Sequence, residues 1–203
     1  MNEYKTKFIH KRGMEMDKKN ELLAAAREVF AEKGYKAAGI SDIAKRSQMA
    51  VGSFYKYYES KEAIFLEVYV AENSRVREEI MQRVDWQGEP EAIIEQLFAV
   101  TFELISPNKI LAEWNKPGIS QILHDYYNQD AGRASNAFHQ FLIQTFSQRL
   151  QEEGFSKEKI AEIMKVYDLI YYIDMHVTEQ EFSGYFDSLE TLVKYFVKGI
   201  FSK

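Results

Sequence analysis

Residues that break helices are rare in this chain, and their scarcity favours one class of fold. Among 203 residues there are only three prolines, Pro90, Pro107 and Pro117, and ten glycines. Between them, apolar residues recur at intervals of three and four, which is the spacing of amphipathic α-helices. We therefore predict an all-α protein in which prolines and glycines mark the ends of the helices.

The composition indicates an ordinary globular protein, with 46% hydrophobic and 28% charged residues. The absence of cysteine excludes disulfides, thiolate nucleophiles and cysteine-built metal sites, and it fits a reducing compartment. The opening MNEYKTKFIHKRG has no apolar core of signal-peptide length, and no later stretch is apolar for long enough to cross a bilayer. We expect the protein in the cytoplasm, with no membrane partner.

Charge is unevenly distributed along the chain. Residues 1–61 hold 13 Lys+Arg against 8 Asp+Glu, whereas residues 62–203 hold 13 against 23. A basic end on an acidic body favours a polyanionic partner for the first segment. Chance scatter is the alternative, and charge alone does not decide between the two.

The first third of the chain is organised as short helices. Residues 1–16 are polar, basic and aperiodic and are predicted to form a flexible arm. An apolar stripe then predicts a helix from Asp17, a plausible cap, to Gly34, the expected C-terminal position. The stripe consists of Leu22, Ala26, Val29 and Phe30.

Two further short helices follow closely. Ser41 is expected to cap the second helix, a turn lies around residues 48–49, and the third helix begins at Val51. A fourth helix begins near Ser60 and runs towards Val84. Three helices in under fifty residues, with the second and third joined so tightly, are typical of a helix-turn-helix unit.

The stretch VGSFYKYYESKE, residues 51–62, concentrates rings and lysines. On a continuous helix, Val51, Phe54 and Tyr58 share one face and are predicted to pack inward. The other hydroxyl, ammonium and phenol groups then face outward, where such groups suit phosphates and base edges of DNA. They belong to Ser53, Tyr55, Lys56 and Tyr57. A solvated helix with spare aromatic residues is the alternative.

Residues 22–66, LLAAAREVFAEKGYKAAGISDIAKRSQMAVGSFYKYYESKEAIFL, resemble the DNA-binding region of TetR-family transcriptional regulators. The resemblance depends on an ordered set of positions: Ala25, Ala26, Phe30, Gly34, Tyr35, Ile43, Ala44, Gly52, Phe54, Tyr55, Tyr58 and Lys61. It implies a helix-turn-helix DNA-binding domain at residues 17–61 and a larger helical ligand-binding and dimerisation domain at residues 62–203.

The resemblance also implies a DNA-binding set, with Ser41 and Lys61 on phosphates and the third helix in the major groove. The set is Ser41, Lys45, Gly52, Ser53, Tyr55, Lys56, Tyr57 and Lys61. The turn Ser47-Gln48-Met49-Ala50 departs from the Ala-Gly-Val-Ser that is typical of the family. Gln48 replaces a glycine suited to positive φ, at about 1 kcal/mol of strain if that conformation is kept, and Ala50 gives up a capping hydroxyl worth about 1 kcal/mol.

Further helices are predicted at residues 89–105, 108–114, 118–128, 131–153, 156–179 and 183–201. A DNA-reading unit this small implies a dimer, and the last two predicted helices carry more apolar positions than one core needs. The predicted homodimer interface comprises Val166, Ile173, Phe186, Leu189, Val193, Phe196 and Ile200. Packing of these residues inside one chain remains open.

Large rings gather between Trp86 and Tyr172, in the region where TetR-like proteins usually enclose a small molecule. Candidate ligand-binding residues are Phe102, Glu103, Trp114, Phe138, His139, Tyr167 and Tyr171. An aromatic or amphipathic effector fits such a lining best. An ordinary core requires the same rings, so this alternative also stays open.

The resemblance implies a regulator, most often a repressor, that binds a palindromic operator as a homodimer and is released by a small effector. An enzyme is the main rival, but the histidines His10, His124, His139 and His176 show no metal-ligand spacing, and no nucleotide-binding or nucleophile motif is present. We expect no cofactor, no metal and no catalytic residues. A DNA-binding structural or cell-division factor without a ligand is the remaining alternative.

Overall fold

The computed structural model describes residues 3–116, 118–129, 136–179 and 181–202, and the side chains from residue 16 onward except at 115 and 128. Within these ranges every regular element is a helix, which confirms the predicted all-α class. The chain divides into two compact units. We call them the N-terminal unit, Met1–Asn73 with Asn108–Glu113, and the helical body, Ser74–Pro107 with Trp114–Lys203.

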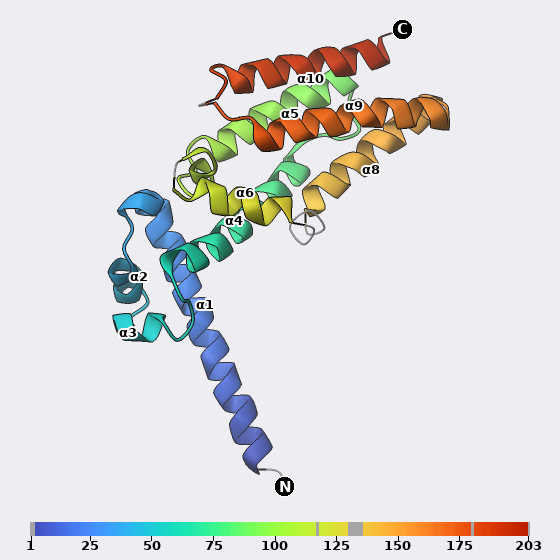
Figure 1. The fold of residues 1–203 in the computed structure, drawn as a ribbon. Helices are drawn as coiled ribbons and strands as arrows, with labels where there is room; N and C mark the ends of the chain where they lie inside the picture. Colours follow the sequence, from blue (N-terminus) through green and yellow to red (C-terminus); the bar gives the residue numbers. More distant parts are fainter. Residues whose placement is uncertain (1–2, 117, 130–135, 180, 203) are drawn as a thin grey trace. The chain divides into compact units, whose positions relative to one another are not determined.

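The N-terminal unit is built around one long helix (Figure 1). Its elements are α1 (Glu3–Ala37), α2 (Ile40–Arg46), α3 (Val51–Phe54) and the first half of α4 (Lys61–Arg83). Its core includes all four residues of the predicted apolar stripe, and the rings of Phe30 and Phe65 meet edge to face at a centroid distance of 4.9 Å. Helix α2 packs against both α1 and α3, as a helix-turn-helix requires.

Helix α1 is longer than the sequence predicted. It starts at Glu3, so the described part of the predicted flexible arm is helical, and Asp17 lies inside the helix rather than at its cap. Residues 3–16 contain no proline and are rich in lysine and methionine, which are good helix formers. The chain kinks at Gly34, whose φ of 74° is the left-handed conformation expected of a C-terminal glycine, and the helix ends at Ala37.

Helix α2 does not begin where the sequence predicted. Gly39 is its N-terminal cap, and the amide of Gly39 donates to Asp42 Oδ2 at 3.0 Å. Ser41 is an exposed residue of the first turn, so its predicted capping role is wrong. The carboxylate of Asp42 takes that role, because it sits three residues after the cap and can reach back to the free amide.

Helix α3 is shorter than predicted. It ends at Phe54, and a turn takes the chain through residues 55–57. The argument that placed Val51, Phe54 and Tyr58 on one helical face therefore fails for Val51, whose side chain is 45% exposed. Phe54 and Tyr58 are buried as predicted, although Tyr58 reaches the core from the segment after the helix.

The helical body contains the second half of α4 and the remaining helices. These are α5 (Pro90–Ile105), η1 (Leu111–Asn115), α6 (Ser120–Asn128), α8 (Ala137–Glu152), α9 (Lys157–His176) and α10 (Tyr185–Phe201). Their bounds agree with the predicted ranges to within a few residues, and the predicted start at residues 131–135 lies outside the described part. Helix α5 packs along α10, and α8 packs along α9 (Figure 1).

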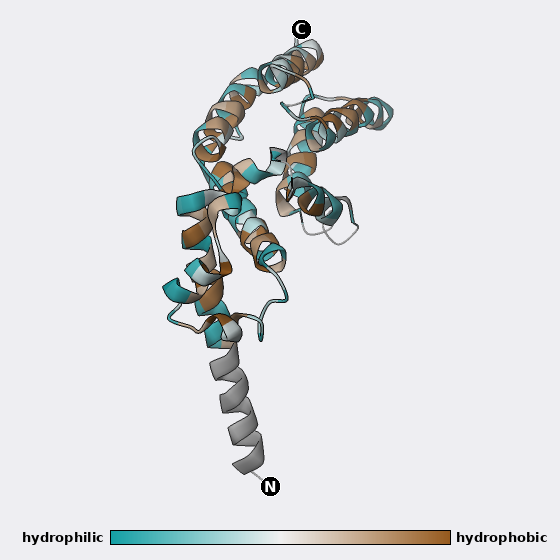
Figure 2. Ribbon diagram, turned by 60° about the vertical axis from the view of Figure 1, so that its left-hand side comes forward, coloured by the Kyte–Doolittle hydropathy of each residue, from teal (hydrophilic) through white to brown (hydrophobic). Residues whose placement is uncertain are grey.

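Hydrophobic and hydrophilic residues alternate along the helices of both units (Figure 2). Among the described residues, no helix joins the length and the apolar character that crossing a bilayer demands. The apolar side chains lie on stripes, which is the pattern of helices that bury one face.

Candidate nucleic-acid interface

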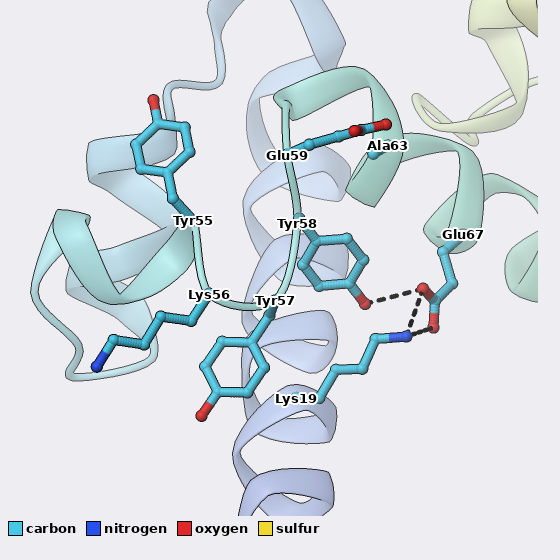
Figure 3. Close-up of a pocket in the computed structure, with 8 residues that line it drawn as sticks. All are labelled: Lys19, Tyr55, Lys56, Tyr57, Tyr58, Glu59, Ala63 and Glu67. Carbon is cyan, nitrogen blue, oxygen red and sulfur yellow. Dashed lines mark hydrogen bonds and ion pairs between the residues drawn. The ribbon is translucent and has the colours of Figure 1, made fainter.

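The stretch after Val51 has an inward half and an outward half. Phe54 is fully buried, whereas the next residue, Tyr55, is 57% exposed, and the two rings meet edge to face at 5.4 Å. Lys56 is exposed and Tyr57 is half-buried. In Figure 3, Tyr58 points towards Glu67, while Lys56 and Tyr57 point away from it. One face of this stretch is therefore free to meet another molecule.

A polar contact fixes the turn that carries these side chains. The hydroxyl of Tyr58 donates to Glu67 Oε2 at 2.9 Å, and Lys19 Nζ donates to both oxygens of Glu67 at 3.0 and 3.1 Å (Figure 3). Burial, and then the neighbouring carboxylate, raise the pKa of Tyr58, so the phenol stays a donor. No pattern in the sequence predicted this contact, because helical periodicity does not link the three residues.

The same segment borders an open groove. The groove is lined by Lys19, Tyr55, Lys56, Tyr57, Tyr58, Glu59, Ala63 and Glu67. Lys19 is engaged with Glu67, while Lys56 forms no salt bridge with any residue that the structure describes. Lys45 on α2 is likewise exposed and unpaired within the described residues. These two ammonium groups are therefore available for phosphates.

Lys61 also binds backbone carbonyl groups of the N-terminal unit, which the sequence did not indicate. Its ammonium donates to the carbonyl oxygens of Tyr35 and Ala38, both at 3.0 Å, and lies 4.2 Å from the centre of the Tyr35 ring. These carbonyls lie in the last turn of α1 and directly after the helix, where a cation is favourable. Lys61 has three N–H donors, so two of them serve the fold and one is left for another partner.

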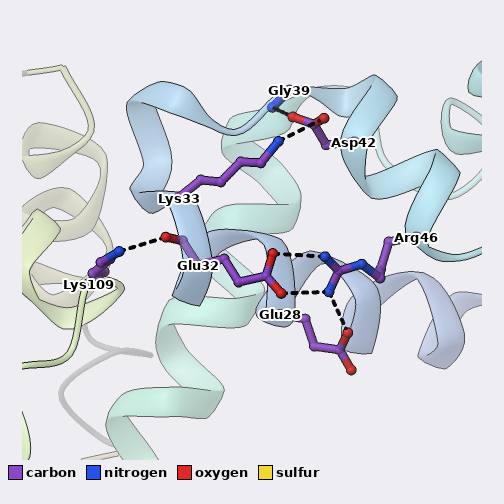
Figure 4. Close-up of polar contacts among 7 residues, drawn as sticks. All are labelled: Glu28, Glu32, Lys33, Gly39, Asp42, Arg46 and Lys109. Carbon is purple, nitrogen blue, oxygen red and sulfur yellow. Dashed lines mark hydrogen bonds and ion pairs between the residues drawn. The ribbon is translucent and has the colours of Figure 1, made fainter.

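Ion pairs hold α2 against α1 (Figure 4). The guanidinium of Arg46 donates to Glu28 at 2.9 Å and to both oxygens of Glu32 at 2.9 and 2.8 Å. Lys33 Nζ lies 2.9 Å from Asp42 Oδ1. Arg46 lowers the pKa of Glu32, and Lys33, followed by the Gly39 amide, lowers the pKa of Asp42. Arg46 thus orients α2.

The turn between α2 and α3 keeps the conformation that suits a glycine at position 48. Gln48 has a φ of 57°, the left-handed region in which glycine is favoured, so the strain expected for this residue is present. Ala50 is the N-terminal cap of α3 and supplies no side-chain hydrogen bond. Ser47 Oγ donates to the carbonyl of Ile43 at 3.0 Å and closes α2.

Four of the predicted ligand-binding residues lie on the paired helices α8 and α9. The Tyr167 hydroxyl and His139 Nδ1 are 3.2 Å apart, and the rings of His139 and Tyr171 stack at 3.7 Å. Phe138 is buried and carries the guanidinium of Arg77 over its ring at 4.8 Å. Burial lowers the pKa of His139, partly opposed by Asp168. The sequence missed Arg77, because nothing in its spacing points to Phe138.

The other three predicted ligand-binding residues lie elsewhere in the body. Phe102 is 72% exposed on α5, and the adjacent Glu103 is exposed and pairs with Arg83 at 2.6 Å. The pKa of Glu103 is lowered by this contact with Arg83. The rings of Trp114 and His124 lie tilted against each other, with their centres 4.2 Å apart. Phe102 and Glu103 thus present their side chains outward rather than to an enclosed cavity.

The predicted dimer residues divide between the surface and the interior. Val166 and Phe186 are exposed, whereas Leu189 is buried and Phe196 packs on Phe146 of the same chain, with ring centres 6.2 Å apart. Three others, Ile173, Val193 and Ile200, are half-buried. Further exposed apolar residues lie on the same two helices and just before α10: Leu169, Tyr172, Phe182, Leu192 and Tyr195.

Part of the chain matches a known protein family. Residues 22–68 match the family model for bacterial regulatory proteins of the tetR family. The matched range contains α2, α3 and the outward-facing side chains, so it coincides with the surface built above.

Two curated relatives match over the same part of the chain. An uncharacterized HTH-type transcriptional regulator, YdgC of Bacillus subtilis (strain 168), is 42% identical over 62 residues, which are 30% of this chain and 32% of the relative. The HTH-type transcriptional regulator QacR of Staphylococcus aureus is 34% identical over 64 residues, 32% of this chain and 34% of the relative. The matches thus span about a third of the length of these relatives.

Solved structures resemble more of the chain. A TetR-family transcriptional regulator from Mesorhizobium loti MAFF303099 is 21% identical and covers 91% of this chain and 95% of its own, with a TM-score of 0.53. At this identity the likeness concerns the fold: an N-terminal helix-turn-helix unit followed by a larger helical unit.

Proposed function

We propose that the chain is a TetR-family transcriptional regulator that binds a palindromic DNA operator as a homodimer, because residues 22–68 match the family model for bacterial regulatory proteins of the tetR family. The observation that carries the proposal is the outward half of residues 53–57, where exposed Tyr55 and Lys56 stand beside fully buried Phe54. A side chain whose only role was packing in the core would be buried. Phenol and ammonium groups suit base edges and phosphates.

The unpaired cations support the same surface. Carboxylates of the N-terminal unit neutralise Arg46 and Lys19, whereas Lys45 and Lys56 form no salt bridge with a described residue. We expect Lys45, Lys56 and the third N–H of Lys61 to contact phosphates. Ser41, Ser53 and Tyr57 complete the proposed contact set, and Gly52 lets the backbone of α3 come close to the duplex.

A homodimer is proposed because one short helix reads few base pairs, and two copies bind half-sites about 34 Å apart or at larger separations. The exposed apolar residues of α9 and α10 are the proposed interface, since solvent-exposed Leu169, Leu192 and Tyr195 are otherwise costly. Of the residues predicted from the sequence, Val166 and Phe186 remain in this interface, and buried Leu189 supports it from within.

We further propose that the regulator is a repressor and that a small aromatic or amphipathic effector releases it. The group of Phe138, His139, Tyr167 and Tyr171 is the proposed effector region, because it combines stacked rings with two polar groups that can orient a ligand. Binding of operator DNA would take place in the cytoplasm. Catalysis, a cofactor and a metal are not part of the proposal.

The test uses purified protein and a fluorescent fragment of the DNA that flanks its own gene, titrated over a salt series. We expect saturable binding that resists competitor DNA and weakens linearly in the logarithm of salt concentration. A Tyr55→Ala/Lys56→Ala variant should lose at least tenfold in affinity. Lys159→Ala, which removes an exposed lysine of α9, is the matched control and should bind like the parent protein.

Two outcomes would count against the proposal. Equal, weak binding to every DNA fragment would argue against a specific operator at this locus. Equal affinity of the double variant and the control would show that the outward residues of α3 and the following turn do not read DNA. For the effector, compounds that release the parent protein should fail to release His139→Ala, while that variant still binds the operator.

A further inference from the structure

A short segment far along the chain is part of the N-terminal unit. The chain leaves this unit after Asn73, forms α5 in the helical body, returns for Asn108–Glu113, and leaves again. Within the returning segment, Ile110 and Leu111 are almost completely buried. We call Asn108–Glu113 the strap. The apolar side chains of the strap are part of the core of the unit that carries the proposed DNA-binding surface.

Polar contacts fix the beginning of the strap. The side-chain amide of Asn108 donates to Glu72 Oε1 at 2.9 Å, and its oxygen accepts from the amides of Ile110 and Leu111, both at 3.1 Å. Glu72 is only 3% exposed, and its other oxygen accepts from Arg27 Nε at 2.8 Å. A buried carboxylate is tolerated when it is paired and hydrogen-bonded in this way.

The far end of the strap reaches the junction between α1 and α2. Glu113 is 4% exposed, and its Oε1 accepts from the backbone amide of Tyr35 at 3.2 Å. Gly34 makes room for it, since a Cβ at that position would lie 3.3 Å from the same oxygen. Lys109 Nζ donates to the carbonyl of Glu32 at 2.6 Å, so the strap contacts α1 on both sides of the kink.

The junction is held from other sides as well. The Tyr35 hydroxyl donates to Glu62 Oε1 at 2.5 Å, and Lys61 binds the carbonyl oxygens of Tyr35 and Ala38. Tyr35 is therefore fixed through its amide, its carbonyl and its side chain. Helix α2 begins five residues later, so the position of Tyr35 sets the direction in which α2 and α3 leave α1.

We propose that Glu113 is a positioning residue for operator recognition. By holding the amide of Tyr35 it fixes the α1–α2 junction, and through it the orientation in which Tyr55 and Lys56 are presented to DNA. The inference rests on the proposed function, since it assumes a specific operator. It adds to the DNA-binding domain a residue that lies 78 positions from its partner and outside the range that matches the family model.

The test compares full-length Glu113→Ala and Glu113→Gln with the parent protein, using operator DNA and an unrelated fragment. Glu113→Ala should weaken operator binding about tenfold, the effect of one hydrogen bond to a charged group. Binding to the unrelated fragment and the slope of affinity against salt should stay the same, because no phosphate donor has been removed. Glu113→Gln keeps an oxygen that can accept from Tyr35 and should stay within about threefold of the parent.

Amide hydrogen exchange gives a readout that does not depend on DNA. The Tyr35 amide should exchange slowly in the parent protein and in Glu113→Gln, and at least tenfold faster in Glu113→Ala. Glu162→Ala is the matched control, since it removes an exposed carboxylate that pairs with Lys159, and it should change neither measurement. If Glu113→Ala does not fold, Lys109→Met is measured in its place. The exposed side chain of Lys109 also contacts α1 beside the kink, and loss of this contact should weaken operator binding about threefold.

Failure of this inference differs from failure of the proposed function. If the parent protein binds no operator, both the proposed function and the role of Glu113 in recognition are wrong. This holds whatever exchange rate is measured for the Tyr35 amide. If the parent binds a specific operator but Glu113→Ala binds it equally well, only the positioning role is overturned. An equal loss of operator and unrelated DNA binding in Glu113→Ala would also overturn it.

Discussion

Phe54 and Tyr55 are neighbours in the chain, and their rings meet edge to face at 5.4 Å, yet the first is fully buried and the second is 57% exposed. The last residue of α3 thus anchors the segment in the core while the residue after it faces outward. The backbone turns at this point, which allows two adjacent aromatic side chains to serve stability and recognition separately.

This division predicts different effects on stability. Phe54→Ala should lower the free energy of unfolding by about 3–5 kcal/mol, because it removes a fully buried ring from the core. Tyr55→Ala should cost at most about 1 kcal/mol, the value of the ring contact at an exposed position. Denaturant unfolding of both variants measures the difference, and similar losses for the two would show that Tyr55 is also a core residue.

Gly52 offers a test of close approach to DNA. In the free protein a Cβ at this position meets no other atom within 4 Å, so Gly52→Ala should leave the free energy of unfolding unchanged or raise it by up to about 1 kcal/mol. Operator affinity should fall several-fold if the duplex comes close to this part of α3. Thermal unfolding and DNA titration of the same sample separate the two effects, and unaltered affinity would place the duplex further away.

The strained turn at Gln48 predicts a stabilising substitution. Gln48→Gly should raise the free energy of unfolding by up to about 1 kcal/mol, since glycine adopts a φ of 57° without the steric cost of a side chain. Gln140→Gly is the matched control: it lies exposed within α8 and should lose about 1 kcal/mol. Chemical denaturation measures both, and a loss at position 48 would mean that the Gln48 side chain contributes more than its backbone costs.

The exposed apolar residues of α9 and α10 predict how the proposed dimer can be broken. Leu192→Glu should give a folded monomer at concentrations where the parent protein is dimeric, because a carboxylate at the centre of an apolar interface loses its water without gaining a partner. Sedimentation velocity and circular dichroism check assembly and folding. Lys159→Glu on the same pair of helices should remain a dimer, and a dimeric Leu192→Glu would locate the interface elsewhere.

The half-buried imidazole of His139 predicts a pH dependence of stability. Because its pKa in the folded protein is lowered, the unfolded chain binds the proton more tightly. The free energy of unfolding should therefore fall as pH drops below about 6.5, the ordinary value, and this contribution should level off below the pKa of the folded state. His139→Phe should lack this component, so the difference between parent and variant unfolding energies should depend on pH from 7.5 down to 5; a constant difference would contradict the prediction.

The amino-acid sequence by itself determined the class of fold and most of the local conformation. Apolar residues at intervals of three and four predicted the helices, and Gly34 predicted the end of the regular part of α1. These features depend on contacts within about four residues, so they can be recognised in a linear pattern. Periodicity failed where α3 stopped after one turn, and Val51 became exposed.

Only the tertiary structure decided which polar groups are engaged and which remain available. The sequence alone does not distinguish engaged cations from available ones. Carboxylates or carbonyl oxygens distant along the chain bind Arg46, Lys19 and Lys61, whereas no described residue forms a salt bridge with Lys45 or Lys56. The strap contact between Glu113 and Tyr35 joins residues 78 positions apart. Such contacts arise when packing brings charged groups together out of water, and the choice of partner depends on distances that exist only in the folded chain.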